Sequence, residues 1–495
     1  MIAPGEQVGF LRAVRMGGSA AAAFGDEPVD VVIDGGAVAD IAPTGALRPR
    51  GAVIDGEGGR VVPGLWDHHV HTVQWALRAQ RFALEKVTTA AEAARLAGAA
   101  ETLSDGRVVG AGFRDGLWPD APSLALLDAA TGERPTYLIN ADVHSVWLNT
   151  AAFRREGFIA PVDGMLREHD AFEISRRLNA ADDATADAAV AEAGAAAAAR
   201  GITGLVDFDM AWNADAWQRR ASAGFDAHHV EFAVYPAGLQ RAIDEGLRSG
   251  ELLPDTAGLV RMGPLKLISD GSLGTRTAAC SHAYAGDPSN FGVLTISPDD
   301  LRELLTSATA SGLEVAVHAI GDRAVASALD AFTFTQARGT IEHAQLVRHA
   351  DLARFAHLGV VASVQPEHAV DDRDLATGLW AAQQSIGYPL ASLLTAGVQV
   401  RFGSDAPVAP LDPWLTIAAA VHRTGDEREA WHPEERVSIE AALRASSRHG
   451  STEVEIGGAA DLVLCGADPL TSTREQLREM PVIATLLGGR VTHLA

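Results

Sequence analysis

The sequence predicts an α/β protein: a (β/α)8 TIM-like barrel, a small β-sandwich domain built from both chain ends, and an insertion after the first barrel strand. Three observations support this fold class. From residue 61 onward, apolar strand-like runs alternate with helical, alanine-rich segments, which is typical of parallel βα units. Both chain ends are β-rich instead. Residues 72–200 separate the first two strand-like runs, far more than a βα loop needs.

The chain ends are predicted to form one composite β-sandwich from residues 1–60 and 445–495. The first segment holds short β-rich runs such as VDVVIDGGAVADIAP with turn glycines between them, and no helix-length periodic stretch. The second contains ADLVLCGADPL and PVIATLLGGRVTHLA, which again favour strands. Because both segments favour strands, we expect the two chain ends to complete a single sheet structure.

The barrel is predicted over residues 61–444, with an inserted subdomain at about 75–195 that holds RVVGAGFRDGLW and PTYLINADVHSVWLN. The alanine-rich stretch at 184–200 favours a helix before the second strand. Eight runs are candidate barrel strands: residues 60–71, 201–209, 230–236, 260–269, 313–322, 339–346, 359–368 and 398–407.

Charge and hydropathy exclude several kinds of partner. The formal net charge is −24, which disfavours both nucleic acid and an anionic membrane surface, so a small-molecule substrate remains. No segment approaches the roughly 18 consecutive apolar residues of a spanning helix, and the first thirty residues do not resemble a secretory leader. We therefore expect a cytoplasmic protein. Whether it forms a homo-oligomer is left open.

Ligand-type side chains recur where the predicted strands end. His69 and His71 close the first run, and simple alternation places both on one face and His68 on the other. His318, His343 and Asp405 end the fifth, sixth and eighth runs. Barrel enzymes build their active sites at the carboxyl ends of strands. A single buried histidine there is usually a core residue, whereas four histidines and an aspartate together predict a divalent metal.

The ligand types also indicate what the metal does. Imidazole and carboxylate groups suit Zn, Mn or Fe in the divalent state, and the absence of thiolates disfavours a closed structural zinc site. We therefore expect an open, catalytic site.

Five segments carry a resemblance to a known family: PGLWDHHVH, KLISDGSLGTRT, HAIGDRAV, IEHAQ and GSDAPV. Together they resemble the amidohydrolase superfamily, and most closely its family 3 branch that includes N-substituted formamide deformylases. The resemblance extends over nearly the whole chain. It implies a barrel that binds one or two divalent ions, zinc first with Mn or Fe as alternatives. The implied ligands are His69, His71, His318, His343 and Asp405.

Lys266 is one of only two lysines in the chain and lies between apolar residues on the fourth run. In many binuclear relatives a carboxylated lysine on the fourth strand bridges the metals, so the resemblance implies this role for Lys266. An arginine would not serve, because its guanidinium stays protonated. The alternative is an unmodified lysine paired with a carboxylate such as Asp270.

The metal and the resemblance together predict a hydrolase that cleaves the C–N amide bond of a small N-acyl or N-formyl amine. A bound cation lowers the pKa of a coordinated water toward about 7 and so supplies hydroxide. Asp405 is then expected to carry the proton to the leaving nitrogen.

Other activities remain alternatives to amide hydrolysis. One is a mononuclear deaminase of the same superfamily, although its proton-donating Glu is absent after His318, where AIGD follows. A cyclic-amide hydrolase is another. The third is a non-catalytic binding protein on this scaffold, although relatives of that kind tend to lose metal ligands and this chain keeps them.

Substrate-binding residues are expected in three places. Arg114, Trp118 and His144 in the insertion are candidates to cover the metals, although the aromatic residue could equally be plain core. Asp270 and Arg276 belong to the DGSLGTRT turn, where Arg276 is expected to hold a substrate anion. His368, after SVQPE, ends the seventh run and is a further candidate.

Overall fold

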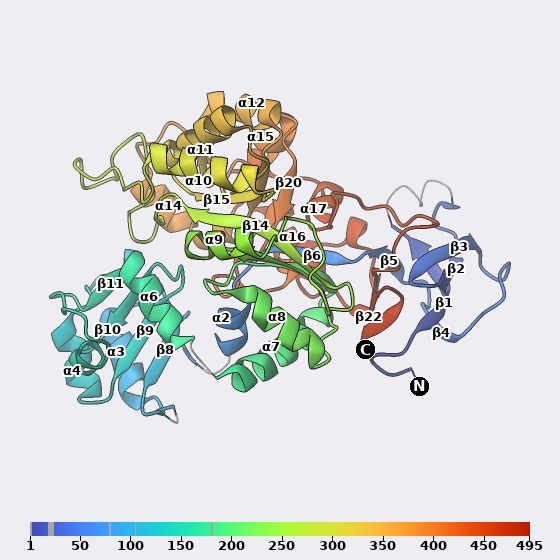
Figure 1. Ribbon diagram of the computed structural model, residues 1–495, viewed down its shortest axis with the longest axis horizontal. Coiled ribbons are helices and arrows are strands. Elements are labelled where there is room, and N and C mark those ends of the chain that lie inside the picture. The colour runs from blue at the N-terminus through green and yellow to red at the C-terminus, as the bar shows by residue number, and fades with distance from the viewer. Residues whose placement is uncertain (1, 18–23, 79–80, 104, 180–181) are drawn as a thin grey trace.

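A computed structural model of the chain describes residues 2–17, 24–78, 81–103, 105–179 and 182–495. It confirms the predicted fold class: a barrel of parallel strands lies at the centre, flanked by helices, with further sheets at both ends of the molecule (Figure 1). Each predicted run contains one barrel strand. In chain order these are β6 (Leu65–Val70), β12 (Ile202–Asp207), β13 (His229–Val234), β14 (Val260–Ile268), β15 (Val315–Ala319), β16 (Gly339–His343), β18 (Val361–Val364) and β20 (Val400–Phe402).

Helices cover the outside of the barrel. The alanine-rich α7 (Asp183–Ala198) precedes β12 as predicted and begins at Asp182, whose side chain accepts a hydrogen bond from the Thr185 N–H. The other helices after the barrel strands are α2 (Thr72–Leu77), α8 (Asn213–Ser222), α9 (Pro236–Asp244), α10 (Pro298–Ala310), α11 (Asp322–Thr335), α12 (His349–Leu358), α13 (Pro366–Asp371), α14 (Arg373–Leu379), α15 (Leu390–Thr395), α16 (Pro413–His422) and α17 (Ile439–Ala445). Among the described residues, none of the helices has the length and apolar character needed to cross a membrane.

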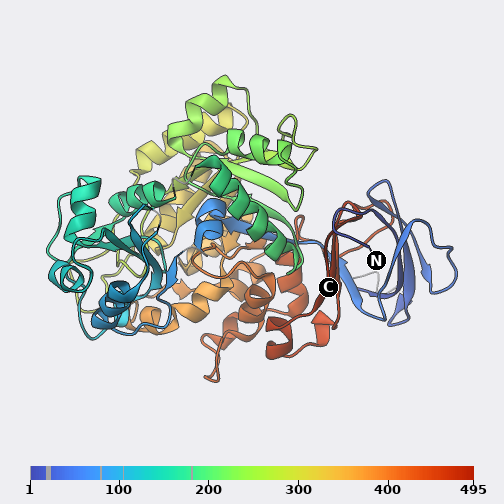
Figure 2. The same cartoon turned by 90° about the horizontal axis from the view of Figure 1, so that it is seen from below.

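The two chain ends meet in one sheet structure, where the N- and C-termini lie close together (Figure 2). Its strand order is β23-β22-β21-β5-β1-β2-β3, with β4 also paired to β1. The bounds are β1 (Val8–Met16), β2 (Val29–Asp34), β3 (Ala37–Pro43), β4 (Ala52–Asp55), β5 (Arg60–Pro63), β21 (Leu462–Cys465), β22 (Val482–Leu487) and β23 (Arg490–Leu494), and α18 (Arg474–Arg478) precedes β22. A bulge in β1 between Leu11 and Val14 lets its two halves pair with different strands.

The run predicted at 60–71 is two strands rather than one. β5 pairs with β1 and β21 in the terminal sheet, whereas β6 pairs with β12 in the barrel. Gly64 lies between them, packed so closely that a Cβ there would meet the Thr203 hydroxyl oxygen at 2.2 Å. The chain thus passes from sheet to barrel in a single residue.

The insertion forms a separate unit beside the barrel mouth (Figures 1 and 2). Its five-stranded sheet has the order β11-β10-β9-β8-β7, and its apolar side chains form their own clusters. The elements run from β7 (Phe82–Ala83) through α3 (Ala90–Ala99), β8 (Val108–Phe113), a short 3-10 turn (Asp115–Leu117), α4 (Leu124–Thr131), β9 (Thr136–Asn140), β10 (Ser145–Leu148), α5 (Thr150–Glu156) and β11 (Met165–Arg167) to α6 (His169–Leu178).

A bulge in β6 overrides the expected alternation of side chains. Between Asp67 and Val70, three steps along β6 match two steps along β12. Such a bulge re-aims the side chains that follow it. His68, predicted on the face opposite to His69 and His71, lines a cavity of the barrel that Glu342 also lines, and Nδ1 of His69 bonds to the same Glu342.

Trp66 fills the barrel interior against Gly204, and this contact can be tested. A Cβ at Gly204 would lie 2.1 Å from the Trp66 ring. We expect Gly204→Ala to lower the free energy of unfolding by about 1–3 kcal/mol through overpacking. Denaturant titration measures this. Gly378→Ala is the control, because the exposed Gly378 has open space around its Cβ position and alanine favours the helix by up to about 1 kcal/mol. Equal stability of the two variants would contradict the packing argument.

Candidate metal centre

The first and last barrel strands bring His69, His71 and Asp405 together. Val70 bridges Ala406 in parallel, the Asp405 N–H donates to the His69 carbonyl at 2.8 Å, and the His71 N–H donates to the Ala406 carbonyl at 2.9 Å. These backbone bonds fix the two segments against each other. The three side chains therefore start from adjacent points at the carboxyl ends of β6 and β20.

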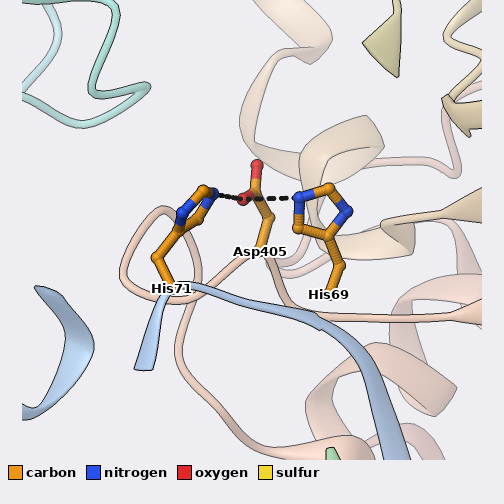
Figure 3. A group of neighbouring side chains, drawn as sticks. All are labelled: His69, His71 and Asp405. Carbon is orange, nitrogen blue, oxygen red and sulfur yellow. Dashed lines mark ion pairs between the residues drawn. The ribbon is translucent and has the colours of Figure 1, made fainter. Parts of the chain in front are cut away.

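The two imidazoles face the same carboxylate from either side (Figure 3). The Nε2 atoms of His69 and His71 lie 3.5 and 3.4 Å from Oδ1 of Asp405. His343 and His368 form a second group with Asp405, in which the donor atoms lie within 4.8 Å of one another. Asp405 thus belongs to two candidate ligand groups. His368, which was predicted to bind substrate, therefore lies among the candidate metal ligands.

His318 belongs to the same cluster of rings but not to either ligand group. Its ring centroid lies 4.5 Å from that of His343, while its Nε2 is 3.4 Å from the Gly271 carbonyl and 3.5 Å from Asp270. The side chain is buried and lines the pocket above the cluster. The five residues implied by the resemblance therefore lie in one neighbourhood, but Nε2 of His318 is turned toward Gly271 and Asp270.

The chemistry of the donor set fits a divalent cation. Burial lowers the pKa of His69 and His343 well below the usual value and that of His318 to about 3, so these rings are neutral, which is the form that binds a metal. The Nδ1 atom of His71 is buried without a hydrogen-bond partner. Neutral imidazoles around an ionised carboxylate suit zinc, manganese or iron.

Two further residues orient the imidazoles, and sequence reasoning missed both. Nδ1 of His69 donates to Oε2 of Glu342 at 2.7 Å, and Nδ1 of His343 donates to Oε1 of Gln365 at 2.8 Å. These bonds leave each Nε2 facing Asp405 or the pocket. Glu342 is 1% exposed, and burial raises its pKa. The only signals in the sequence were the position of Glu342 next to His343 in IEHAQ and the position of Gln365 at a strand end in SVQPE.

Lys266 projects into the base of this cluster from β14. It is 2% exposed, its Nζ lies 3.2 Å from Nε2 of His69, and the ammonium sits 4.1 Å above the Phe208 ring centroid. Burial lowers the pKa of the amine to about 8. Asp270 is not its partner: that carboxylate accepts backbone N–H bonds from Ala279, Ile320 and Gly321. Within the described residues, Lys266 forms no ion pair with a carboxylate.

The backbone is strained at two of these positions. Asp405 has φ of 58° and His343 has φ of 72°, a region that residues with a Cβ seldom occupy. Strain of this kind costs of order 1–3 kcal/mol and persists where surrounding contacts over-determine the conformation. Here the bonds that close the barrel hold Asp405 in place.

A pocket opens above the cluster, between the barrel and the insertion. Its lining includes His318, His343, His368 and Asp405 from the barrel and residues of the insertion, among them Arg114 and His144. The open volume is about 100 Å³. Arg114 is paired with Asp371 at 2.9 Å and so bridges the insertion to α13.

His144 is held over the pocket by an ion pair. Its Nδ1 donates to Glu168 at 2.9 Å. Burial alone would lower the pKa of His144, but Glu168 outweighs it and raises the pKa to about 9. Glu168 also accepts hydrogen bonds from Thr275 and Thr277, while Ser272 donates to Asp142. The DGSLGTRT turn therefore docks the insertion onto the barrel.

Three predicted substrate-binding residues lie outside the pocket. Arg276 is exposed, and with Trp118 it lines a different surface hollow. Trp118 packs on Phe113 and donates to the Val87 carbonyl, as the core alternative predicted. Asp270 is fully buried and holds backbone N–H groups, and burial raises its pKa to about 7. These bonds tie the DGSLGTRT turn to the segments at Ala279 and Ile320.

A parallel barrel that gathers neutral imidazoles and a carboxylate at the carboxyl ends of its strands is typical of the class of metal-dependent barrel enzymes. Comparison with known sequences makes the assignment specific. Residues 52–493 match the amidohydrolase family, so the chain belongs to this family, and the predicted resemblance is confirmed.

Individual relatives are distant but matched over nearly their full length. The protein is 28% identical over 483 residues to Protein LONG AFTER FAR-RED 3 of Arabidopsis thaliana, covering 88% of this chain and 82% of that protein. It is 24% identical over 527 residues to N-substituted formamide deformylase of Arthrobacter pascens, covering 93% and 94%. A crystal structure of an uncharacterised metal-dependent hydrolase from Pyrococcus furiosus superposes with a TM-score of 0.72 at 26% identity, covering 93% of this chain and 99% of that one.

The orientation of His69 by Glu342 leads to a prediction. Glu342→Ala leaves the buried Nδ1 of His69 without its acceptor, so we expect metal affinity to fall by about 10–100-fold. Glu342→Gln is the matched control, because the amide oxygen can still accept the Nδ1 proton and should retain most of the affinity. Competition with a metal chelator measures both. Wild-type affinity in the alanine variant would show that Glu342 does not position His69.

Proposed function

We propose that the protein hydrolyses the C–N amide bond of a small N-acyl or N-formyl amine. The observation that carries this proposal is the convergence of His69 and His71 on Asp405, which lines a pocket, with His343 and His368 completing a second group around the same carboxylate. These residues, with His318, would hold one or two divalent ions. Zinc is the favoured metal, with Mn or Fe as alternatives.

A bound divalent ion would supply two things here, an acidified water and a polarised carbonyl oxygen. The chain's own residues supply the rest. Burial raises the pKa of Asp405, but the hydrogen bond and charge of His71 outweigh burial and lower it, so the carboxylate is ionised and able to accept a proton. With its two oxygens in reach of the pocket, Asp405 would take a proton from the attacking water and return it to the leaving nitrogen.

His144 would orient the substrate from the opposite wall of the pocket. Because Glu168 occupies its Nδ1, the remaining Nε2–H is free to donate to the carbonyl oxygen of a bound amide. The ring centroid of His144 lies 5.5 Å from that of His318, which places this donor beside the cluster. A pocket of about 100 Å³ suits a formyl or short acyl group. The relative named as a formamide deformylase supports the same class of substrate.

The function is tested with zinc-loaded protein and a panel of N-formyl amines, N-acyl amines, cyclic amides and amino-substituted heterocycles. We expect hydrolysis of the formyl or acyl amines, loss of activity on exhaustive chelation and recovery on adding zinc. Asp405→Asn is expected to keep much of the metal and lose about a hundredfold or more of kcat, because its amide cannot carry a proton.

Several outcomes would contradict this proposal. Full activity after metal removal would exclude the metal centre from the reaction. Turnover of cyclic amides alone would indicate a cyclic-amide hydrolase, and turnover of amino-substituted heterocycles alone would indicate a deaminase. Near-normal kcat in Asp405→Asn would show that another group carries the proton.

Lys266 is proposed as a carboxylated bridge between two ions. Its amine is buried beside Nε2 of His69, lacks a carboxylate partner among the described residues and has a pKa lowered to about 8, so a neutral, nucleophilic form is accessible near neutral pH. A carbamate at this point would offer two oxygens to the cluster. It would also replace a buried positive charge, close to cations, by a negative one.

The ranking of two variants tests the bridge. We expect Lys266→Ala to lower the metal content to one ion per chain or none, and Lys266→Arg to be equally damaging, because a guanidinium restores charge without an anionic ligand. Metal analysis of protein prepared with bicarbonate measures this. A short carboxylic acid added to the alanine variant is expected to recover some activity. Normal metal content in the arginine variant would rule out the bridge.

A further inference from the structure

A second cavity, of about 470 Å³, opens at the opposite end of the barrel from the candidate metal centre. Its lining includes Arg261, Val315 and Gly339, at or near the first residues of β14, β15 and β16, so it lies at the amino-terminal ends of the strands. None of its lining residues belongs to the pocket above the histidines. Nothing in the proposed amide hydrolysis uses this space.

A layer of buried side chains closes the cavity on the inside. Trp66, Val206 and Phe208 pack together with Ala233 and Ala316 in the barrel interior. Phe208 touches both sides of this layer, since its ring lies beneath Lys266 and also lines the cavity. A molecule in the cavity would therefore be separated from the metal centre.

Two guanidinium groups line the cavity with donor capacity unused. In the part of the chain that the structure describes, the Arg401 guanidinium has neither an ion pair nor a hydrogen bond, and its Nε is buried. Arg448 stacks over Trp66 at 4.7 Å, and its buried Nε is also unpartnered. His68 also lines the cavity but offers it no donor, because its Nε2 donates to the Ser447 carbonyl at 3.2 Å and the unpartnered Nδ1 of the neutral ring is then an acceptor. Buried donors of this kind are normally satisfied.

The carboxylates that line the cavity do not satisfy them. Glu231 pairs with another nitrogen of Arg448 at 3.3 Å, and Glu314 is exposed. Glu342 accepts from His69 and from the Thr340 hydroxyl. Arg261 already donates to the Gly250 carbonyl, so it is not counted among the unpartnered donors. With three carboxylates nearby, a ligand carrying one negative charge fits the remaining donors better than a dianion does.

We propose that this cavity is a binding site for a small monocarboxylate, held by Arg401 and Arg448. A guanidinium offers two parallel N–H groups to a carboxylate, and such bonds are stronger where water is partly excluded. The volume admits a molecule of about the size of benzoate together with ordered water. The site is separate from substrate binding at the metal centre.

The experiment uses full-length, zinc-loaded protein and 4-bromobenzoate as the probe. Calorimetric titration at constant ionic strength gives the affinity, and the anomalous signal of bromine in soaked crystals gives the position. We expect bromine in the cavity beside Trp66 and Arg401. Arg401→Met and Arg448→Met are each expected to weaken binding by about tenfold or more through the loss of a charge-assisted hydrogen bond.

A matched control separates the site from general charge effects. Arg444→Met removes one positive charge from the exposed surface of α17, where Arg444 pairs with Glu440, and should leave the affinity unchanged. Melting temperatures show that each variant is folded, and either cavity variant alone is sufficient for the test. The proposal is overturned if 4-bromobenzoate does not bind, if bromine appears only at the metal centre, or if both cavity variants bind like the wild type.

Discussion

The contact between the first and last barrel strands is the constraint on which the candidate centre depends. Val70 bridges Ala406, and two backbone hydrogen bonds tie His69 to Asp405 and His71 to Ala406. These bonds juxtapose side chains that come from opposite ends of the barrel sequence. They also hold Asp405 at a positive φ that it would not adopt alone. Any change that opens this seam would separate the carboxylate from both imidazoles at once.

Burial then determines the charge state of the site. Burial lowers the pKa of His69, His343 and His318, so these imidazoles are neutral, whereas Asp405 stays ionised because His71 and other neighbours outweigh the cost of desolvation. Lys266 and Glu342 add one buried amine and one buried carboxyl group to the same region. A cluster of this composition is expensive to keep without a cation to coordinate, and residues such as Gln365 and Glu342 restrict the rings to orientations that serve coordination.

Much of the fold was predictable because it follows from the regular alternation of apolar, strand-like runs with helical segments along the sequence. Eight apolar runs separated by helical segments are sufficient to specify a parallel barrel, and the ligand-type residues stand out because they end those runs. Local backbone features were not predictable. The bulge in β6 turns His68 into the barrel, and Gly64 divides one apparent strand into two.

The direction of individual side chains was also beyond sequence reasoning. Arg276 has φ of 57° and points outward, and Trp118 turns into the core of the insertion, although both belong to segments that reach the site. Glu342 was missed because in the sequence it is only a neighbour of His343, whereas in the structure it accepts a hydrogen bond from His69. Such details depend on packing between elements far apart in the chain.

The insertion has its own apolar clusters, whereas the bonds described between it and the barrel are polar: Ser272 to Asp142, Thr275 and Thr277 to Glu168, and Arg114 to Asp371. This division has a consequence for how such a protein diversifies. Substitutions on the insertion can reshape the upper wall of the pocket without disturbing barrel packing or the residues around Asp405. The residues that contact a substrate from above and the residues that hold the metal can therefore change independently of each other.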